Sequence, residues 1–248
     1  MEILKWAVGP QREAQLLPSV PTLAEKFRAE LLGTFVFVLV GAGSAVGSAG
    51  LAGAGSGSLI LVAALANGIG LAAAVTATLK VSGGSLNPAV SIALWAVGKL
   101  KTREMVAYIV AEVVGAALAG AALIAAFPSE LGNGANWGAP SLSSVISPGQ
   151  GIAIEALMTF VLMFVIYGTA VDARAPHIGG IAIGLAVLAD VLVAGNLTGA
   201  AMNPARAYGP MIAGLSFPGY WYVYAVGPIL GAVVAALAYR YFIERPSE

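Results

Sequence analysis

The sequence predicts an all-α membrane protein with six membrane-spanning helices and two shorter half-helices, arranged as an inverted repeat. Three observations lead to this fold class. The 248 residues are 59% hydrophobic and 10% charged, with a mean hydropathy of +0.89, whereas a soluble domain is about one-quarter charged. Six apolar stretches are long enough to cross a bilayer. A short phrase that contains Asn-Pro-Ala occurs twice.

The six spans are expected to follow a short polar tail. Residues 1–22 carry charges and three prolines and lack the apolar core and cleavage site of a signal peptide, so they are interpreted as a cytoplasmic N-terminal tail. Residues 23–245 are predicted to form one membrane domain. The expected spans, with boundaries uncertain by a few residues, are 25–49, 58–79, 103–126, 151–171, 178–195 and 220–243.

The repeated phrase predicts the start of a helix at two places. Residues 82–91 read SGGSLNPAVS and residues 198–208 read TGAAMNPARAY. Asn is a favoured N-cap, and Pro fits the first helical position, where a backbone N–H would be orphaned anyway. The two motifs comprise Asn87, Pro88, Ala89, Asn203, Pro204 and Ala205.

The helices that begin at these motifs are expected to be half-helices. The apolar runs Pro88–Val97 and Pro204–Leu215 are too short to cross about 30 Å of hydrocarbon. If their N-termini meet at the midplane, two positive dipole ends and two amide donors lie at one place in the membrane.

The basic residues predict the orientation, because short loops rich in Lys and Arg stay in the cytoplasm. Eleven of the twelve Lys and Arg residues flank spans on one side, which predicts that both termini are cytoplasmic. The loops at 50–57 and 127–150 contain none. The exception is Arg206, which follows the second Asn-Pro-Ala motif and is expected near the extracellular mouth.

The chain also contains an internal repeat. Residues 29–35 read AELLGTF and residues 154–160 read IEALMTF, and in each case Asn-Pro-Ala follows one span later. Three spans separate the two copies, so the second copy is inverted relative to the first. The repeats cover about 23–126 and 149–243, and such a plan places binding or conduction at the interface between them.

The doubled motif, the Ala-Glu-x-x-Gly-Thr opening at residues 29–34 and the Asn-Pro-Ala-Arg of the second copy resemble the aquaporin, or major intrinsic protein, family. The resemblance runs from about residue 24 to residue 243. The pair of motifs is far more specific than a single Asn-Pro-Ala, which could be a coincidental helix cap. The resemblance implies a channel domain over 23–245 and a homotetramer with one pore per subunit, without a cofactor or metal.

The residues of the two phrases agree with a channel. Small side chains allow carbonyl oxygens to face a lumen, and the expected pore carbonyls are those of Gly83, Gly84, Ser85, Gly199, Ala200 and Ala201. A file of acceptors that leads to two amide donors suits a permeant such as water, which both donates and accepts. A water between the amides gives both lone pairs to them, so a chain for proton transfer is interrupted there.

The resemblance also implies a selectivity filter. Its four positions fall on Asn67, Val191, Ala200 and Arg206. Strictly water-selective members are similar to one another in carrying Phe and His at the first two positions, and the smaller Asn67 and Val191 predict a wider filter here. Arg206 is interpreted as a functional charge that repels cations, with snorkelling to the outer interface as the alternative.

Three acids require an interpretation within the membrane. The resemblance implies that Glu30 and Glu155 face inward and accept hydrogen bonds from the irregular loops, which is a structural role; a proton relay is the alternative. Glu112 stands where many relatives carry Gln and is either protonated and hydrogen-bonded or part of a gate. Ser85 stands where many relatives carry His, and either widens the cytoplasmic vestibule or caps the loop.

The predicted function is a passive channel for water and small neutral solutes, such as ammonia, hydrogen peroxide or urea, that excludes protons and ions. The filter region resembles the tonoplast-intrinsic and ammonia-permeable branch of the family. The alternatives are a glycerol-type facilitator, an ion-coupled secondary transporter and a membrane protein with a closed pore. An enzyme is not expected, because no nucleophile with a base, metal cluster or cofactor loop is present. The expected partners are the solutes and the lipid bilayer of the plasma membrane, and zero net charge argues against nucleic acid.

Overall fold

The computed structural model describes residues 20–50, 55–176 and 178–244. Six long helices cross the molecule, and each is apolar and long enough to span a membrane. They are α2 (Leu23–Ser48), α3 (Ser56–Ser82), α5 (Thr102–Ala126), α7 (Pro148–Ile166), α8 (Gly179–Thr198) and α10 (Val223–Phe242). A π-helical turn, η2 (Tyr167–Val171), extends α7. These helices confirm the predicted spans to within a few residues at each end, and most of the expected N-terminal tail lies outside the described residues.

Two short helices confirm the predicted half-helices. They are α4 (Pro88–Ala96) and α9 (Pro204–Ala213), and both begin at the proline of an Asn-Pro-Ala motif. The connection between α5 and α7 contains a short helix, α6 (Ser129–Gly134), and a 3-10 turn, η1 (Asn136–Gly138). The sequence analysis did not predict these two elements, because a helix of one or two turns has no hydrophobic periodicity.

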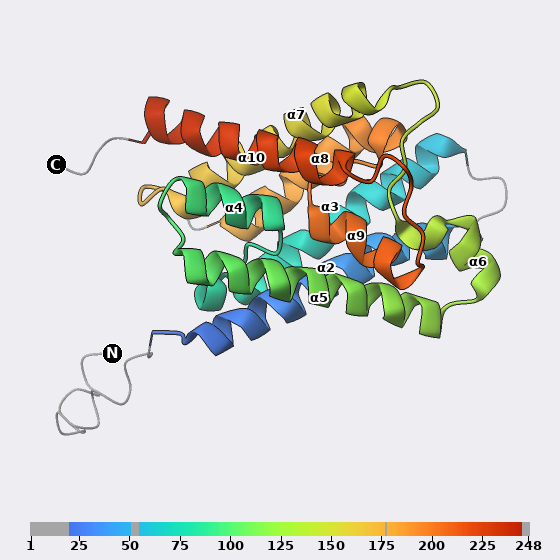
Figure 1. Cartoon of the computed structure of the whole chain (residues 1–248), viewed down its shortest axis with the longest axis horizontal. Coiled ribbons are helices and arrows are strands. Elements are labelled where there is room, and N and C mark those ends of the chain that lie inside the picture. The colour runs from blue at the N-terminus through green and yellow to red at the C-terminus, as the bar shows by residue number, and fades with distance from the viewer. Residues whose placement is uncertain (1–19, 51–54, 177, 245–248) are drawn as a thin grey trace.

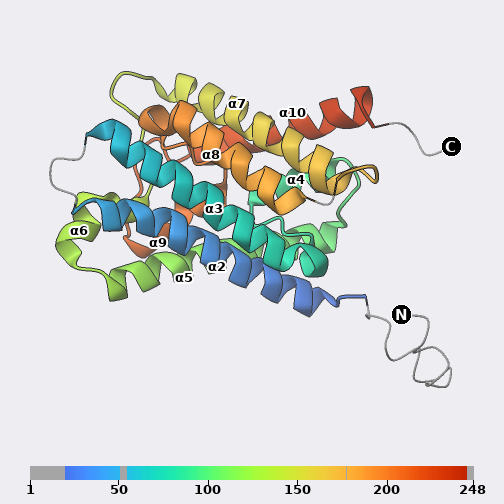
Figure 2. The ribbon, with the colours of Figure 1, turned by 180° about the vertical axis from the view of Figure 1, so that it is seen from behind.

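The helices form one elongated bundle. In Figure 1, α10, α4, α5 and α9 face the viewer, and the opposite face in Figure 2 shows α2, α3, α7 and α8. The beginning of α2 and the end of α10 lie at the same end of the bundle, whereas α6 lies at the other end (Figure 1). We call these the terminal end and the distal end. Between them, α4 and α9 approach each other inside the bundle.

The packing follows the inverted repeat. Helix α2 packs on α5 as α7 packs on α10, and α4 contacts α10 as α9 contacts α5. The contact between α3 and α8 joins the two repeats, and small residues make it close. A Cβ atom on Gly68 would lie 2.7 Å from the carbonyl oxygen of Gly184, so any larger side chain there would force the helices apart.

A polar cluster at the terminal end joins the connection between α7 and α8 to the end of α10. Asp172 accepts hydrogen bonds from the backbone N–H and the guanidinium of Arg174, and from the hydroxyl of Tyr239. Arg174 also donates to the carbonyl oxygen of Ile243. The Arg174 guanidinium holds the pKa of Asp172 well below its usual range, so the aspartate stays charged in the folded protein.

This cluster predicts a loss of stability in acid. A carboxylate whose pKa is depressed stabilises the fold above the unfolded-state value, about 3.9, and this stabilisation is lost as the pH falls through the folded value. We therefore expect Asp172→Asn to lower the melting temperature in detergent near neutral pH and to flatten its decline on acidification. Glu130→Gln, at an exposed position of α6, is the control. Equal pH dependence in Asp172→Asn and the native protein would contradict the assignment.

Candidate functional site

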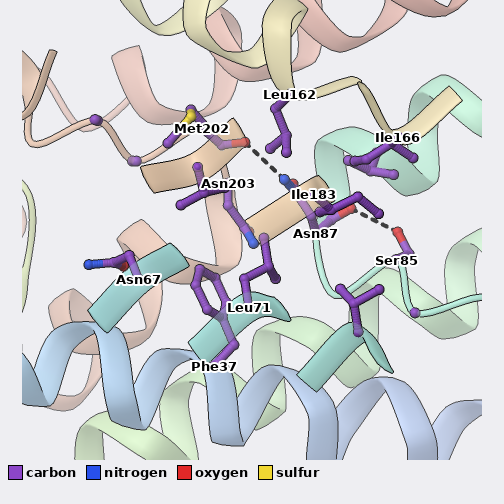
Figure 3. A pocket seen from close by; sticks show the side chains of 16 residues that line it. Phe37, Asn67, Leu71, Ser85, Asn87, Leu162, Ile166, Ile183, Met202 and Asn203 are labelled. Carbon is purple, nitrogen blue, oxygen red and sulfur yellow. Dashed lines mark hydrogen bonds between the residues drawn. The ribbon is translucent and has the colours of Figure 1, made fainter. Parts of the chain in front are cut away.

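The two Asn-Pro-Ala motifs are joined by reciprocal hydrogen bonds near the centre of the bundle. The side-chain Nδ2 of Asn87 donates to the carbonyl oxygen of Met202 at 2.9 Å (Figure 3). The Nδ2 of Asn203 donates to the carbonyl oxygen of Leu86 at 2.7 Å. Each repeat therefore satisfies a backbone carbonyl of the other, over more than 110 residues of sequence.

The same asparagines cap the half-helices with their side-chain oxygens. Asn87 Oδ1 accepts from the backbone N–H of Ala89, and Asn203 Oδ1 accepts from those of Ala205 and Arg206. A carboxamide has two N–H donors, and the reciprocal bonds use one on each side. Because both asparagines line a central cavity (Figure 3), one amide donor of each remains for a molecule inside it.

The backbone that leads into each motif is irregular in the same way. Gly83, Gly84 and Leu86 have positive φ angles of 90°, 62° and 50°. In the second phrase Gly199, Ala200 and Met202 have 81°, 45° and 51°. This conformation turns the peptide groups out of helical register. Within the described residues, no protein group donates to the carbonyl oxygens of Gly83, Gly84, Ser85, Gly199, Ala200 and Ala201.

Two fully buried glutamates hold these irregular segments. Glu30 accepts from the backbone N–H groups of Ser85 and Leu86 at 3.0 and 2.7 Å. Glu155 accepts from those of Ala201 and Met202 at the same two distances. Each carboxylate therefore satisfies two N–H groups that the broken helix would leave unpaired, and each uses both of its oxygens to do so.

A narrow cavity runs between the two segments and leaves about 20 Å³ for the centres of water-sized molecules. That is on the order of one water. Toward the terminal end it shares Gly84 and Ser85 with a vestibule of about 1050 Å³. At the distal end, a separate hollow of about 330 Å³ includes Ala63, one helical turn from the cavity residue Asn67, and shares no lining residue with the cavity. The cavity is thus a constriction that opens into a wider vestibule toward the terminal end.

Two of the filter positions are in direct contact. Asn67 Oδ1 accepts from Nε of Arg206 at 3.4 Å, and Asn67 Nδ2 donates to the carbonyl oxygen of Ala63. Arg206 Nη1 donates to the carbonyl oxygen of Gly138 at 3.0 Å. A Cβ atom on Gly41 would collide with Asn67 Oδ1, so this glycine provides the space for the carboxamide. Asn67 therefore orients Arg206 and is not a freely projecting polar group.

The other two filter positions differ from each other. Ala200 lines the narrow cavity beside Asn67, whereas Val191 is buried and does not line it. The residue one turn earlier, Val187, lines the cavity instead. Arg206 does not line this cavity either. The structure thus joins Asn67 to Arg206 directly and places Val191 one helical turn beyond the cavity residue Val187.

Most of the apolar wall of the cavity was not predicted from the sequence. Leu71 and Val75 follow Asn67 on α3 at intervals of four residues, and Ile183 and Val187 on α8 occupy the positions that match Asn67 and Leu71. A spacing of four residues places side chains on one face of a helix. The same stripe in both repeats is the signal that could have identified these residues.

Comparison with known proteins agrees with this geometry. The sequence profile of the family described as Major intrinsic protein matches residues 18–239. The chain belongs to the aquaporin, or major intrinsic protein, family. The probable aquaporin AqpM of Archaeoglobus fulgidus is 39% identical over 90% of this chain and 98% of its own length. The probable aquaporin TIP3-2 of Arabidopsis thaliana is 40% identical over 87% of this chain and 82% of its own.

A solved structure shows the same aquaporin fold. The aquaglyceroporin from Plasmodium falciparum superimposes with a TM-score of 0.81 at 25% identity, and the match covers 90% of this chain and 97% of that one. Together with the family membership, the fold establishes a multi-pass membrane channel for water and small solutes.

The paired acids give a stability prediction. In Glu155→Gln, the carboxamide keeps one acceptor oxygen and turns an NH2 group toward a backbone N–H, so one buried donor loses its partner. We expect a loss of about 1–3 kcal/mol in the free energy of unfolding, measured by titration with SDS. Glu130→Gln is the matched control because its side chain is exposed. A Glu155→Gln protein as stable as the control would contradict the structural role of the acid.

Proposed function

We propose that water and small neutral solutes pass in single file through the narrow cavity between the two Asn-Pro-Ala motifs, and that protons and ions do not. The observation that carries this proposal is the order of hydrogen-bonding groups along the path. Unpaired carbonyl acceptors lie on both sides, and two amide donors, one each from Asn87 and Asn203, lie between them.

This order supports proton exclusion. A water that accepts from both asparagine amides has no lone pair left, so it cannot take a proton from the next water in the file. The N-termini of α4 and α9 add two positive dipole ends at the same place, which raise the energy of a cation there. Glu30 and Glu155 are each bound to two backbone N–H groups, which supports a structural role over a proton relay or an ion-coupled transporter.

The residues at the filter positions support a selection of solutes by the width of the path and by the hydrogen-bond donors that Arg206 offers. Arg206, held by Gly138 and Asn67, offers guanidinium donors beside the small Ala200. Because Asn67, Val191 and Ala200 are all small for a filter, we propose that ammonia, hydrogen peroxide and urea pass along with water. The glycerol-type alternative remains to be tested by flux, since the similar Plasmodium structure is an aquaglyceroporin.

The same proposal includes orientation and assembly. The described basic residues other than Arg206 lie at the terminal end of the bundle, which supports cytoplasmic termini by the positive-inside rule. They are Lys26, Arg28, Lys80, Lys99, Lys101, Arg103, Arg174 and Arg240. We propose a cytoplasmic tail over 1–22, a channel domain over 23–245, a homotetramer with one pore per subunit, and location in the plasma membrane. Native mass spectrometry tests the homotetramer, and cell fractionation tests the location in the plasma membrane.

The test of the proposed permeation is stopped-flow light scattering on vesicles that contain the purified protein. We expect osmotic water flux above that of empty vesicles, entry of urea and ammonia, and slower entry of glycerol. A pH-sensitive dye inside the vesicles should report no added proton flux. Solute uptake that needs a proton gradient would contradict passive permeation, and proton flux above the empty-vesicle rate would contradict exclusion at the asparagines.

The contact between Asn67 and Arg206 gives a selectivity prediction. Asn67→Leu keeps the approximate volume but removes the acceptor for Arg206 Nε, so Arg206 loses one of its two side-chain tethers. We expect the ratio of urea to water permeability to change by about two- to tenfold, the range that one hydrogen bond supplies.

A second variant tests the same contact from the other helix. Gly41→Ala should displace the Asn67 carboxamide and change the ratio in the same direction. Gly47→Ala is the matched control, because a Cβ atom there meets nothing within 4 Å. If Gly41→Ala and Gly47→Ala give the same ratio as the native channel, Asn67 does not set selectivity through Arg206.

A further inference from the structure

A serine hydroxyl lies on the wall where the narrow cavity opens into the terminal vestibule. Ser85 lines both spaces, and its side chain stands beside Asn87 in Figure 3. The matching residue of the second phrase is Ala201, which has no hydroxyl. The two irregular segments therefore differ by one hydroxyl at this position, although their backbones are alike.

Ser85 is connected to a buried acid through a second serine. The Ser85 and Ser91 hydroxyl oxygens lie 2.7 Å apart, and Ser91 Oγ donates to Glu112 Oε1 at 2.8 Å. Ser91 and Glu112 are both fully buried. The matching residues of the second repeat are Ala207 and Pro228, so this relay of Ser85, Ser91 and Glu112 exists in the first repeat alone.

A count of protons shows what the relay does to Ser85. Each hydroxyl has one proton. When Ser91 donates to Glu112, Ser85 donates to Ser91. When a protonated Glu112 donates to Ser91, Ser91 donates to Ser85, whose own proton then goes to the carbonyl oxygen of Asn87, 3.3 Å away. In both arrangements Ser85 has no proton for the lumen and presents lone pairs to it.

We propose that Glu112 is a positioning residue that acts through Ser91 to hold Ser85 as an acceptor on the pore wall, and that Ser85 contacts the permeating solute and helps to determine selectivity. This inference rests on the proposed permeation path. The fixed hydroxyl extends the row of carbonyl acceptors by one group. It favours solutes with several N–H donors, such as urea and ammonia, which need acceptors to replace their lost water.

The relay also removes a group that could pass protons. A hydroxyl that rotates freely beside a file of water donates and accepts in turn, as a water does. With its proton engaged by Ser91 or by the Asn87 carbonyl, Ser85 cannot donate to the file. Glu112, which has Ser91 between itself and Ser85, exchanges no proton with the lumen except through this relay.

A double-mutant cycle separates this role from a purely structural one. The Glu112 carboxyl also lies near that of Glu30, so a change at Glu112 could act by disturbing Glu30. The cycle compares the native channel, Ser85→Ala, Glu112→Leu and the double variant by the ratio of urea to water permeability in vesicles. If the native channel excludes urea, ammonia influx takes its place.

We expect Ser85→Ala and Glu112→Leu each to lower the ratio by about two- to fivefold. The double variant should be no lower than Ser85→Ala, because residues that act through one another are not additive. Glu112→Gln should restore the native ratio, since a carboxamide still accepts from Ser91. If Glu112→Leu does not fold, Ser91→Ala takes its place in the cycle.

Three results would overturn the inference. They are an unchanged ratio in Ser85→Ala, an equal further loss when Glu112→Leu is added to Ser85→Ala, and a native channel that passes water but neither urea nor ammonia. Failure of the permeation path itself has a different signature, because native vesicles would then show no water flux above empty ones, whatever the variants do.

Discussion

A helix can stop in the middle of a membrane only if the backbone groups that it releases find partners inside the protein. In this chain the partners are two carboxylates and two carboxamides. Glu30 and Glu155 accept hydrogen bonds from the backbone N–H groups of the irregular segment that precedes each half-helix. Asn87 and Asn203 each donate to a backbone carbonyl oxygen of the opposite repeat. In the described part of the chain, the carbonyl oxygens of these segments that accept from no protein group belong mostly to residues that line the cavity or the terminal vestibule. The path is thus a direct result of how the breaks are stabilised.

The two repeats share this scaffold but differ in the side chains added to it. Arg206 follows the second motif where the first has Val90, and it introduces a charge toward the distal mouth. Ser91 and Glu112 are present only in the first repeat, and they act on the terminal mouth. The backbone that both halves need is therefore symmetric, whereas the groups that we propose to distinguish one solute from another are not. A substitution of such a side chain can alter selectivity without disturbing the hydrogen bonds that hold the two irregular segments.

The sequence predicted the helices that depend on residues close together in the chain. Asn-Pro predicted the caps and starts of both half-helices, and apolar runs long enough to cross a bilayer predicted the spans. It did not predict contacts that depend on distant residues. The tie between Asn67 and Arg206 needs the space beside Gly41 and the carbonyl of Gly138, which lies in an unpredicted turn. Val191 lies one helical turn from the cavity residue Val187, and its place in the filter stays a prediction.

The reciprocal bonds between the motifs also constrain how the chain is made. Asn87 and Met202 are 115 positions apart, and at about 5–20 residues per second a ribosome needs on the order of 10 s to cover that distance. Throughout that interval the first half-helix has been synthesised without the carbonyl that its cap will contact. The first repeat therefore lacks this contact until the second repeat has been synthesised. Its final geometry is a late event of biogenesis that depends on the arrival of the second repeat.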